Sequence, residues 1–230
     1  MKHIVIGIEG LVGAGKTSLC QILLDKIPNS ILLKGGDIYR AIVFAIMQSG
    51  IPLEKLTSKF TNINMKEILD RLQLQIGLEN RETVVYIKGT KMKEEDLQSN
   101  QSSIAVSMVS KVADNRKLYE FGKEIIRSFQ EKYNVILSSR DIMRMYPETD
   151  YHFLISASLE ERVKRKFSQY HGKVSKEEIR KSIEQRDLLQ KQAGYYDQFD
   201  KTIKVDVTNL DTPEKAAQEV LKYISFSSIA

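Results

Sequence analysis

The sequence has little cysteine: Cys20 is the one cysteine among 230 residues. A single cysteine can form neither an internal disulfide nor a cysteine cluster for zinc, so a reducing cytoplasm is the expected compartment. Long apolar runs are also missing. The longest in the first half covers residues 41–47, whereas a membrane-spanning helix needs about 20 apolar residues. The chain enters an apolar segment at Ile4 without the features of a secretory signal peptide, which argues against export.

The composition supports a packed core. Hydrophobic residues make up 42% and charged residues 28% of the chain, which is too much apolar material for a disordered protein. A single domain over residues 1–230, with a modest insertion, is expected. The net charge of +5 and the pI of 9.1 indicate an anionic partner, either a nucleic acid or a small phosphate compound.

Five short apolar segments are typical of parallel strands that are covered on both faces. Apolar residues at helical spacing separate these segments. The pattern predicts an α/β fold with a parallel sheet flanked by helices. The predicted strands cover residues 3–8, 31–33, 134–137, 151–155 and 202–207.

A polar insert interrupts this series at about residues 51–100. Its apolar positions alternate on both sides of a polar turn at residues 79–82, which predicts a small antiparallel hairpin. Helical spacing returns at residues 104–112 and 118–129. Before the insert, Asp37 is expected to cap a helix.

A second excursion, at about residues 159–194, is charged and helical. Ser175 and Glu178 within it form a capping-box pattern, which predicts the start of a helix. Near the end of the chain, Thr212 and Pro213 are expected to open the last helix as N-cap and first-turn proline.

Residues 10–17, Gly-Leu-Val-Gly-Ala-Gly-Lys-Thr, match the phosphate-loop pattern. Such glycines let backbone N–H groups point at phosphate oxygens, and the next helix presents its positive end. Lys16 is expected to reach the β- and γ-phosphates, and the Thr17 hydroxyl to bind Mg²⁺. A strand-loop-helix context predicts a P-loop NTPase-type sheet; ATP is favoured, and GTP stays open. The predicted ATP-binding residues are Gly10, Gly13, Ala14, Gly15, Lys16, Thr17 and Ser18.

Several arginines narrow the class of phosphate-loop protein. Phosphoryl transfer to an anionic acceptor brings negative charges together and needs cations beyond one lysine and Mg²⁺. Arg40 and Arg140 lie at predicted sheet-to-helix turns, where parallel strand ends converge near the loop. Arg116 lies near the start of another predicted helix. Arg162 and Arg186 lie on the charged excursion, where a mobile lid would place them.

Residues 10–20, 35–40, 139–141 and 183–187 follow one another in a specific order. In these motifs the chain resembles the bacterial cytidylate (CMP/dCMP) kinases, a family of nucleoside monophosphate kinases, and the resemblance covers nearly the whole chain. It implies ATP-dependent phosphoryl transfer to CMP or dCMP with Mg²⁺. It also implies that the hairpin insert binds the acceptor and that the charged excursion is a helical lid.

The resemblance further implies roles for single residues. Ser107, Arg116 and Asp141 match residues that read the cytosine, since a carboxylate can accept from its exocyclic amine and a guanidinium can donate to its ring acceptors. Arg40 and Arg140 match residues that hold the acceptor phosphate.

Two arginines of the charged excursion complete the site that the resemblance implies. Arg186 matches an arginine near the sugar and phosphate of bound CMP. Arg162 would belong to the lid that closes over the donor. The predicted catalytic residues are Lys16, Arg140 and Arg162.

The chain also departs from the family pattern. Lys34 and Gly35 stand where the family has Asp or Ser and then Thr, and Ser138 stands where it has Asp. Gln190 and Ala193 replace an acidic and a basic residue of the sugar-binding run. Recognition of the ribose hydroxyl is therefore expected to be weakened.

Two other functions stay open on the sequence. The departures favour a related kinase with a different small-molecule acceptor. A non-catalytic nucleotide-binding regulatory protein could use the basic surface for nucleic acid, but acidic residues interrupt the basic ones at residues 160–165, which disfavours that partner. A monomer that binds small nucleotides and no membrane is expected.

Overall fold

The computed structural model describes residues 3–48, 70, 73–93, 97, 116–195, 197 and 199–225. These residues divide into two compact units. Unit 1 comprises Met1–Leu32 and Arg127–Ala230, and unit 2 comprises Leu33–Ile126. Helices and strands alternate along the chain, so the predicted α/β class is confirmed.

The described strands form one eight-stranded sheet, in the order β3-β4-β2-β6-β1-β7-β8 with β5 beside β4. The five strands at the centre of unit 1 are, in sheet order, β2 (Ser30–Lys34), β6 (Asn134–Ser138), β1 (Val5–Gly10), β7 (Tyr151–Ser156) and β8 (Thr202–Asp206). The pairs β1 with β6, β1 with β7 and β7 with β8 are parallel. Each strand coincides with a predicted apolar segment, because a strand covered on both faces needs apolar residues almost throughout.

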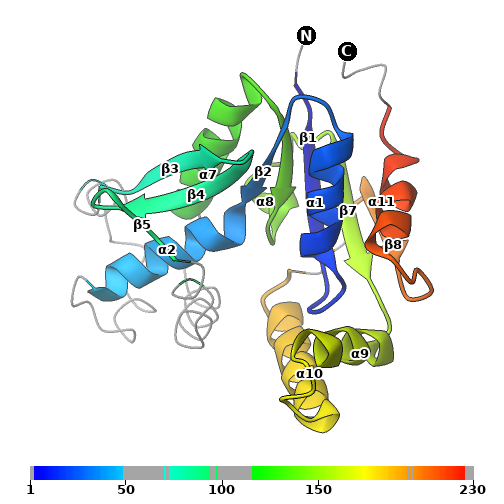
Figure 1. Ribbon diagram of the computed structural model, residues 1–230. Coiled ribbons are helices and arrows are strands. Elements are labelled where there is room, and N and C mark those ends of the chain that lie inside the picture. The colour runs from blue at the N-terminus through cyan, green and yellow to red at the C-terminus, as the bar shows by residue number, and fades with distance from the viewer. Residues whose placement is uncertain are drawn as a thin grey trace. The chain divides into compact units, whose positions relative to one another are not determined.

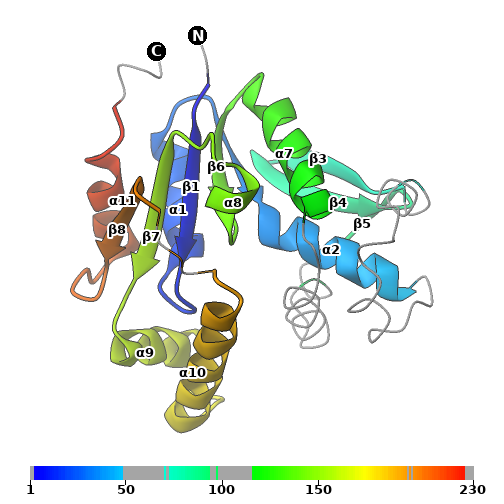
Figure 2. The same cartoon turned by 180° about the vertical axis from the view of Figure 1, so that it is seen from behind.

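Helices cover both faces of this sheet. The helices α1 (Lys16–Lys26) and α11 (Pro213–Leu221) lie side by side over one face (Figure 1). The short helix α8 (Ile142–Met145) lies over the other face (Figure 2). Ile6, Leu23 and Phe153 are fully buried in the main core. Helix α8 was not predicted, because four residues are too few to show a helical period.

The charged excursion forms two helices, α9 (Leu159–Gln169) and α10 (Lys176–Gln192). The Ser158 hydroxyl caps α9 by accepting from the backbone N–H of Glu161. Ser175 and Glu178 form the predicted capping box of α10. Val163 of α9 and residues of α10 pack on Val12 of the phosphate loop in a small separate core. The helices are confirmed; their closure as a lid stays a prediction.

The last helix begins as predicted. The Thr212 hydroxyl accepts from the backbone N–H of Lys215, and Pro213 occupies the first turn of α11.

Unit 2 contains the predicted antiparallel hairpin, β3 (Gln75–Glu79) and β4 (Glu82–Ile87), with the two-residue strand β5 (Thr90–Lys91) paired to β4. Asn80 and Arg81 form its turn with φ angles of 49° and 66°. Two consecutive residues with positive φ give the turn whose twist matches that of a hairpin.

The other elements of unit 2 are helices. Helix α2 (Gly35–Gln48) begins two residues before Asp37, so the prediction that Asp37 caps it is wrong: Asp37 lies in the first turn and accepts from Arg40. Helix α7 (Arg116–Gln130) starts in unit 2 and confirms the predicted helix at residues 118–129. The helix expected at residues 104–112 lies outside the described residues. None of the helices described is long and apolar enough to cross a bilayer.

Candidate active site

The phosphate loop connects β1 to α1. Gly13 and Gly15 have φ angles of 79° and 94°, a region that favours glycine. The backbone N–H groups in the first turn of α1 have no partner within the helix, and no side chain caps this helix. Gly10 has no room for a side chain, because a Cβ there would lie 2.4 Å from the carbonyl oxygen of Ile155. The loop therefore has the backbone shape of an anion-binding helix start.

Lys16 folds back onto its own loop. Its Nζ donates to the carbonyl oxygen of Gly10 at 2.9 Å. Burial, together with the nearby charges of Arg140 and Arg186, lowers the pKa of Lys16 to about 7, against opposing effects of Cys20 and Glu9. An ammonium with a lowered pKa gains most from a new anionic neighbour, since such a neighbour favours its charged form.

Two arginines of α9 hold carbonyl groups of the loop. Arg162 is 6% exposed and donates through one terminal nitrogen to the carbonyl oxygen of Val12, at 3.2 Å, and to the carboxylate of Asp187, at 2.6 Å. Arg165 donates to the carbonyl oxygen of Ala14 at 3.0 Å. Both arginines fix the loop from outside, and Arg162 also joins α9 to α10.

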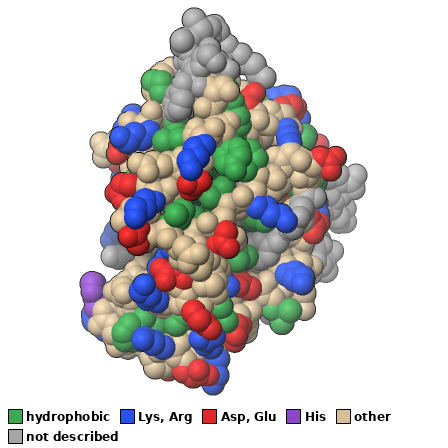
Figure 3. Space-filling model, turned by 90° about the vertical axis from the view of Figure 1, so that its right-hand side faces the viewer, with side chains coloured by type: hydrophobic (Ala, Val, Ile, Leu, Met, Phe, Trp, Pro, Cys, Tyr) green, Lys and Arg blue, Asp and Glu red, His purple; other side chains and the backbone are tan. Residues whose placement is uncertain are grey.

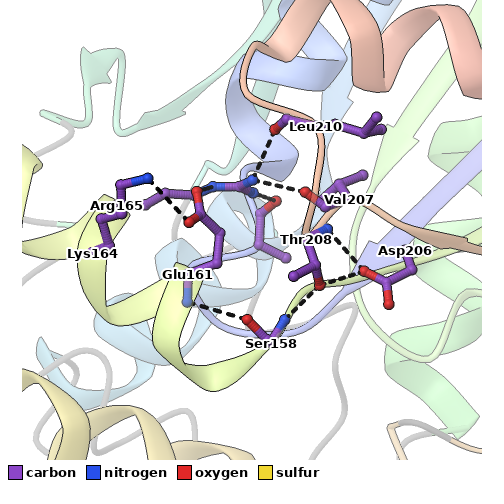
Figure 4. Close-up of polar contacts among 9 residues, drawn as sticks. Ser158, Glu161, Lys164, Arg165, Asp206, Val207, Thr208 and Leu210 are labelled. Atoms are coloured by element: carbon purple, nitrogen blue, oxygen red, sulfur yellow. Dashed lines mark hydrogen bonds and ion pairs between the residues drawn. The ribbon is translucent and has the colours of Figure 1, made fainter.

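Arg165 connects three segments around the loop (Figure 4). Its Nε donates to Glu161 on the same helix at 3.0 Å. Its other terminal nitrogen donates to the carbonyl oxygens of Val207, at 2.8 Å, and Leu210, at 3.2 Å, in the connection between β8 and α11. Arg165 lies within the charged excursion predicted at about residues 159–194, but the backbone carbonyl groups that it contacts carry no sequence signal.

Further cations gather near Lys16. Arg140 follows β6, and Arg186 lies on α10. Burial lowers the pKa of Lys166 on α9, and the charge of Arg186 adds to this. Mutual repulsion among these cations costs free energy, and binding of a polyanionic ligand would relieve the repulsion.

Asp141 lies between β6 and α8 and is 7% exposed. It has a left-handed backbone conformation, with φ 57° and ψ 34°. The backbone N–H of the next residue, Ile142, donates to Oε1 of Glu9 at 2.5 Å. Glu9 also lies 3.3 Å from Nε2 of His152, whose Nδ1 contacts the Thr202 hydroxyl at 2.9 Å. This buried polar chain anchors the segment that carries Arg140 and Asp141.

No local pattern of the sequence indicates this anchor. Glu9 lies in β1 and His152 in β7, and both side chains are buried. Their proximity depends on the register of β1 and β7, in which His152 is opposite Gly7. A sequence position alone cannot show that register.

Cys20 and Ser138 meet behind the loop. Burial raises the pKa of the Cys20 thiol to about 12, although a hydrogen bond with Ser138 opposes the shift. The thiol is therefore protonated and packs as a small buried side chain.

The hydroxyl of Thr17 is the protein group here that would bind a magnesium ion. Within the described part of the chain, no three His, Cys, Asp or Glu side chains are grouped to hold a metal. Thr17 is exposed in the first turn of α1, so its hydroxyl fits the role. Mg²⁺ keeps several waters and is commonly held by substrate phosphates with few protein ligands.

The structure brings part of the predicted site together in unit 1: the loop, Arg140, Asp141, Arg162 and Arg186. Arg40 lies in unit 2 and pairs with Asp37 at 3.0 Å. Arg116 is the first residue of α7, and nothing is described of its side chain; Ser107 lies outside the described residues. The roles of all these residues stay predictions.

Known proteins identify the family. The family model described as cytidylate kinase matches residues 6–227. The chain belongs to the cytidylate kinase family. It is 28% identical over 229 residues to a cytidylate kinase of Clostridioides difficile, with 97% of each chain covered. The identity is 30% to that of Caldicellulosiruptor saccharolyticus, with 96% coverage of each, and 29% to that of Bacillus pumilus, with 94% coverage of each.

Membership in the cytidylate kinase family indicates that the reaction is phosphoryl transfer to a nucleoside monophosphate. The chain is an enzyme, a nucleoside monophosphate kinase. The family resemblance seen in the motifs at residues 35–40, 139–141 and 183–187 is confirmed.

Proposed function

We propose that this kinase transfers the γ-phosphoryl group of ATP to CMP or dCMP. The observation that carries the proposal is the grouping of a buried carboxylate, Asp141, with Arg140 and the phosphate loop in unit 1. Asp141 can accept from the exocyclic amine of cytosine, whereas uracil has a carbonyl oxygen at the same ring position. Relatives that match the chain over nearly its full length carry the name cytidylate kinase.

Transfer would be direct and in line, without a covalent enzyme intermediate. Catalysis then consists of positioning and charge neutralisation. Lys16 would leave the carbonyl of Gly10 and bind the β- and γ-phosphates, and Arg140 would stabilise negative charge on the transferred group. Arg162 would serve the donor side, and its contact with Val12 supports a role in holding the loop.

On the acceptor side, Arg40 and Arg140 would hold the phosphate of the monophosphate. Ser107 and Arg116 would join Asp141 in reading the base. Arg186 would lie near the sugar and phosphate. These roles rest on the family motifs and on the cationic surroundings of Lys16.

Mg²⁺ would bind with ATP, and the Thr17 hydroxyl is the protein group that would hold it. The ion would neutralise charge on the β- and γ-phosphates and favour their in-line geometry. The protein itself supplies the backbone donors of residues 13–18 and the ammonium of Lys16.

A small nucleotide fits better than nucleic acid as the anionic partner. On the face shown in Figure 3, basic and acidic side chains are interspersed, and pairs such as Lys215 with Asp211 and Lys222 with Glu219 neutralise each other. A nucleic-acid surface needs a continuous basic stripe. We propose a monomer that acts on nucleotides.

A panel of acceptors tests the proposal. ADP release is measured with ATP·Mg²⁺ and each of CMP, dCMP, UMP, AMP and GMP. CMP and dCMP are expected to react with the highest kcat/KM. Fast reaction of another acceptor with CMP and dCMP inert would overturn the cytidylate assignment and leave the phosphoryl transfer intact.

A further inference from the structure

The guanidinium of Arg144 holds the Asp141 carboxylate, which the proposed function assigns to recognition of cytosine. We call the contacts of Arg144 with Asp141, Gly194 and Asp197 the clamp. Arg144 lies on α8, one turn after Asp141, and its Nη1 donates to Oδ1 of Asp141 at 2.8 Å. The same nitrogen donates to the carbonyl oxygen of Gly194 at 3.1 Å. Its other terminal nitrogen pairs with Asp197. One guanidinium thus joins α8 to the turn that follows α10.

The absence of a side chain at Gly194 leaves space for this guanidinium. A Cβ at Gly194 would lie 3.0 Å and 3.2 Å from the terminal nitrogens of Arg144, and its φ of 75° favours glycine independently. The guanidinium also lies over the ring of Phe199, 5.9 Å from the ring centre. The contacts come from two segments distant in sequence and use both terminal nitrogens and one face of the planar group, as an arginine fork permits.

Asp141 needs such a partner. A carboxylate that is 7% exposed loses hydration and must be compensated by charge or hydrogen bonds. Burial opposes the charge of the Arg144 guanidinium, but Asp141 and Asp197 outweigh it and raise its pKa, which favours the charged pair. The bond from Arg144 to Oδ1 restricts rotation of the carboxylate relative to α8.

We propose that Arg144 is a positioning residue that determines acceptor specificity: it fixes the Asp141 carboxylate for the cytosine amine and ties it to the end of α10. The proposal rests on the proposed function. Hydrogen bonds depend steeply on angle, so a carboxylate that can rotate discriminates less between an amine and a carbonyl. Through Gly194, the clamp also links base recognition to the helix that carries Arg186.

Steady-state kinetics with CMP and UMP test this role. Arg144→Ala is expected to raise KM for CMP and to lower the CMP/UMP ratio of kcat/KM by roughly tenfold, with kcat for CMP changed less than about threefold. Arg144→Lys should restore part of the ratio, because it keeps the charge and loses the fork. A ratio unchanged in Arg144→Ala would overturn the proposal.

A double-mutant cycle separates positioning from a general loss of structure. If Arg144 acts through Asp141, then Arg144→Ala combined with Asp141→Asn should lower the CMP/UMP ratio no further than Asp141→Asn alone. Additive losses would overturn the proposal. Gly194→Ala, which crowds the guanidinium without altering its charge, should lower the ratio in the same direction and by less than Arg144→Ala does.

Arg127→Ala is the matched control. Arg127 also forms an exposed ion pair, with Glu148 at 3.1 Å, and has no place in the proposed site, so the CMP/UMP ratio of Arg127→Ala should equal that of the wild type.

Should Arg144→Ala unfold, Asp197→Asn weakens the clamp from its other end and must lower the ratio. A wild-type enzyme inert toward both CMP and UMP would defeat the proposed function, whereas an active one insensitive to these changes would defeat only the clamp.

Discussion

The phosphate loop and the segment at residues 138–145 are built in different ways. The backbone conformation of the loop comes from glycines in left-handed conformations and from the start of α1, all within a few residues, and Arg162 and Arg165 then hold its carbonyl groups from outside. The segment at residues 138–145 is held by partners far away in sequence: Glu9 accepts from the N–H of Ile142, and the carbonyl oxygen of Gly194 accepts from Arg144. A local motif can be transferred between proteins intact, whereas a segment held by distant partners can be altered by changes elsewhere.

The largest expected effect comes from removing the Lys16 ammonium from the phosphate loop. Lys16→Ala removes the ammonium that would bind the β- and γ-phosphates, and turnover should fall by about 10²-fold or more, as for other charge-stabilising contacts in a dry site. The measurement is ADP formation at saturating ATP and acceptor. Full turnover in this variant would contradict the assignment of the loop.

The anchor of the second segment should be costly to remove. Glu9→Ala leaves the buried N–H of Ile142 without its acceptor and should lower the free energy of unfolding by about 1–3 kcal/mol. Glu9→Gln is the matched control, because its amide oxygen can still accept. Equal stability of the Glu9→Ala and wild-type proteins in denaturant titrations would show that this anchor contributes nothing.

A proton should be taken up when ATP binds. With a pKa of about 7, Lys16 is largely neutral at pH 8, and bound phosphates raise its pKa and favour the charged form. Calorimetry in buffers of different ionisation enthalpy should therefore give uptake approaching one proton at pH 8. Lys16→Arg keeps the charge without titrating in this range, so uptake that persists in this variant would exclude Lys16 as its source.

The smallest effect concerns the sugar. Gln190 stands where the family has a carboxylate, and a neutral amide accepts less strongly from a 2′-hydroxyl, so the preference for ribose should shrink by about 1 kcal/mol. CMP and dCMP are expected to have kcat/KM values within about tenfold of each other. Gln190→Asp should widen that difference, and a wild-type preference far above tenfold would contradict the prediction.

Local patterns predicted most of the fold. Apolar runs marked the strands, the Ser175–Glu178 pair marked the start of α10, and the polar turn marked the hairpin. The exact start of α2 was missed, because Gly35 and Gly36 give no sign of helix and Asp37 is a good cap residue. Helix α8 was missed because its short apolar stretch has no period of its own.

The sequence by itself identified the family and predicted the chemistry of the phosphate loop, because the loop motif consists of neighbouring residues in a set order. Tertiary structure alone decided which carboxylates and guanidinium groups meet. Asp141 is joined to Arg144 within one helical turn, but Glu9, His152 and the Gly194 turn reach this segment only through strand register and helix packing. Partners 50 or more residues apart leave no local pattern, so the geometry that holds the Asp141 carboxylate becomes visible only when the sheet is assembled.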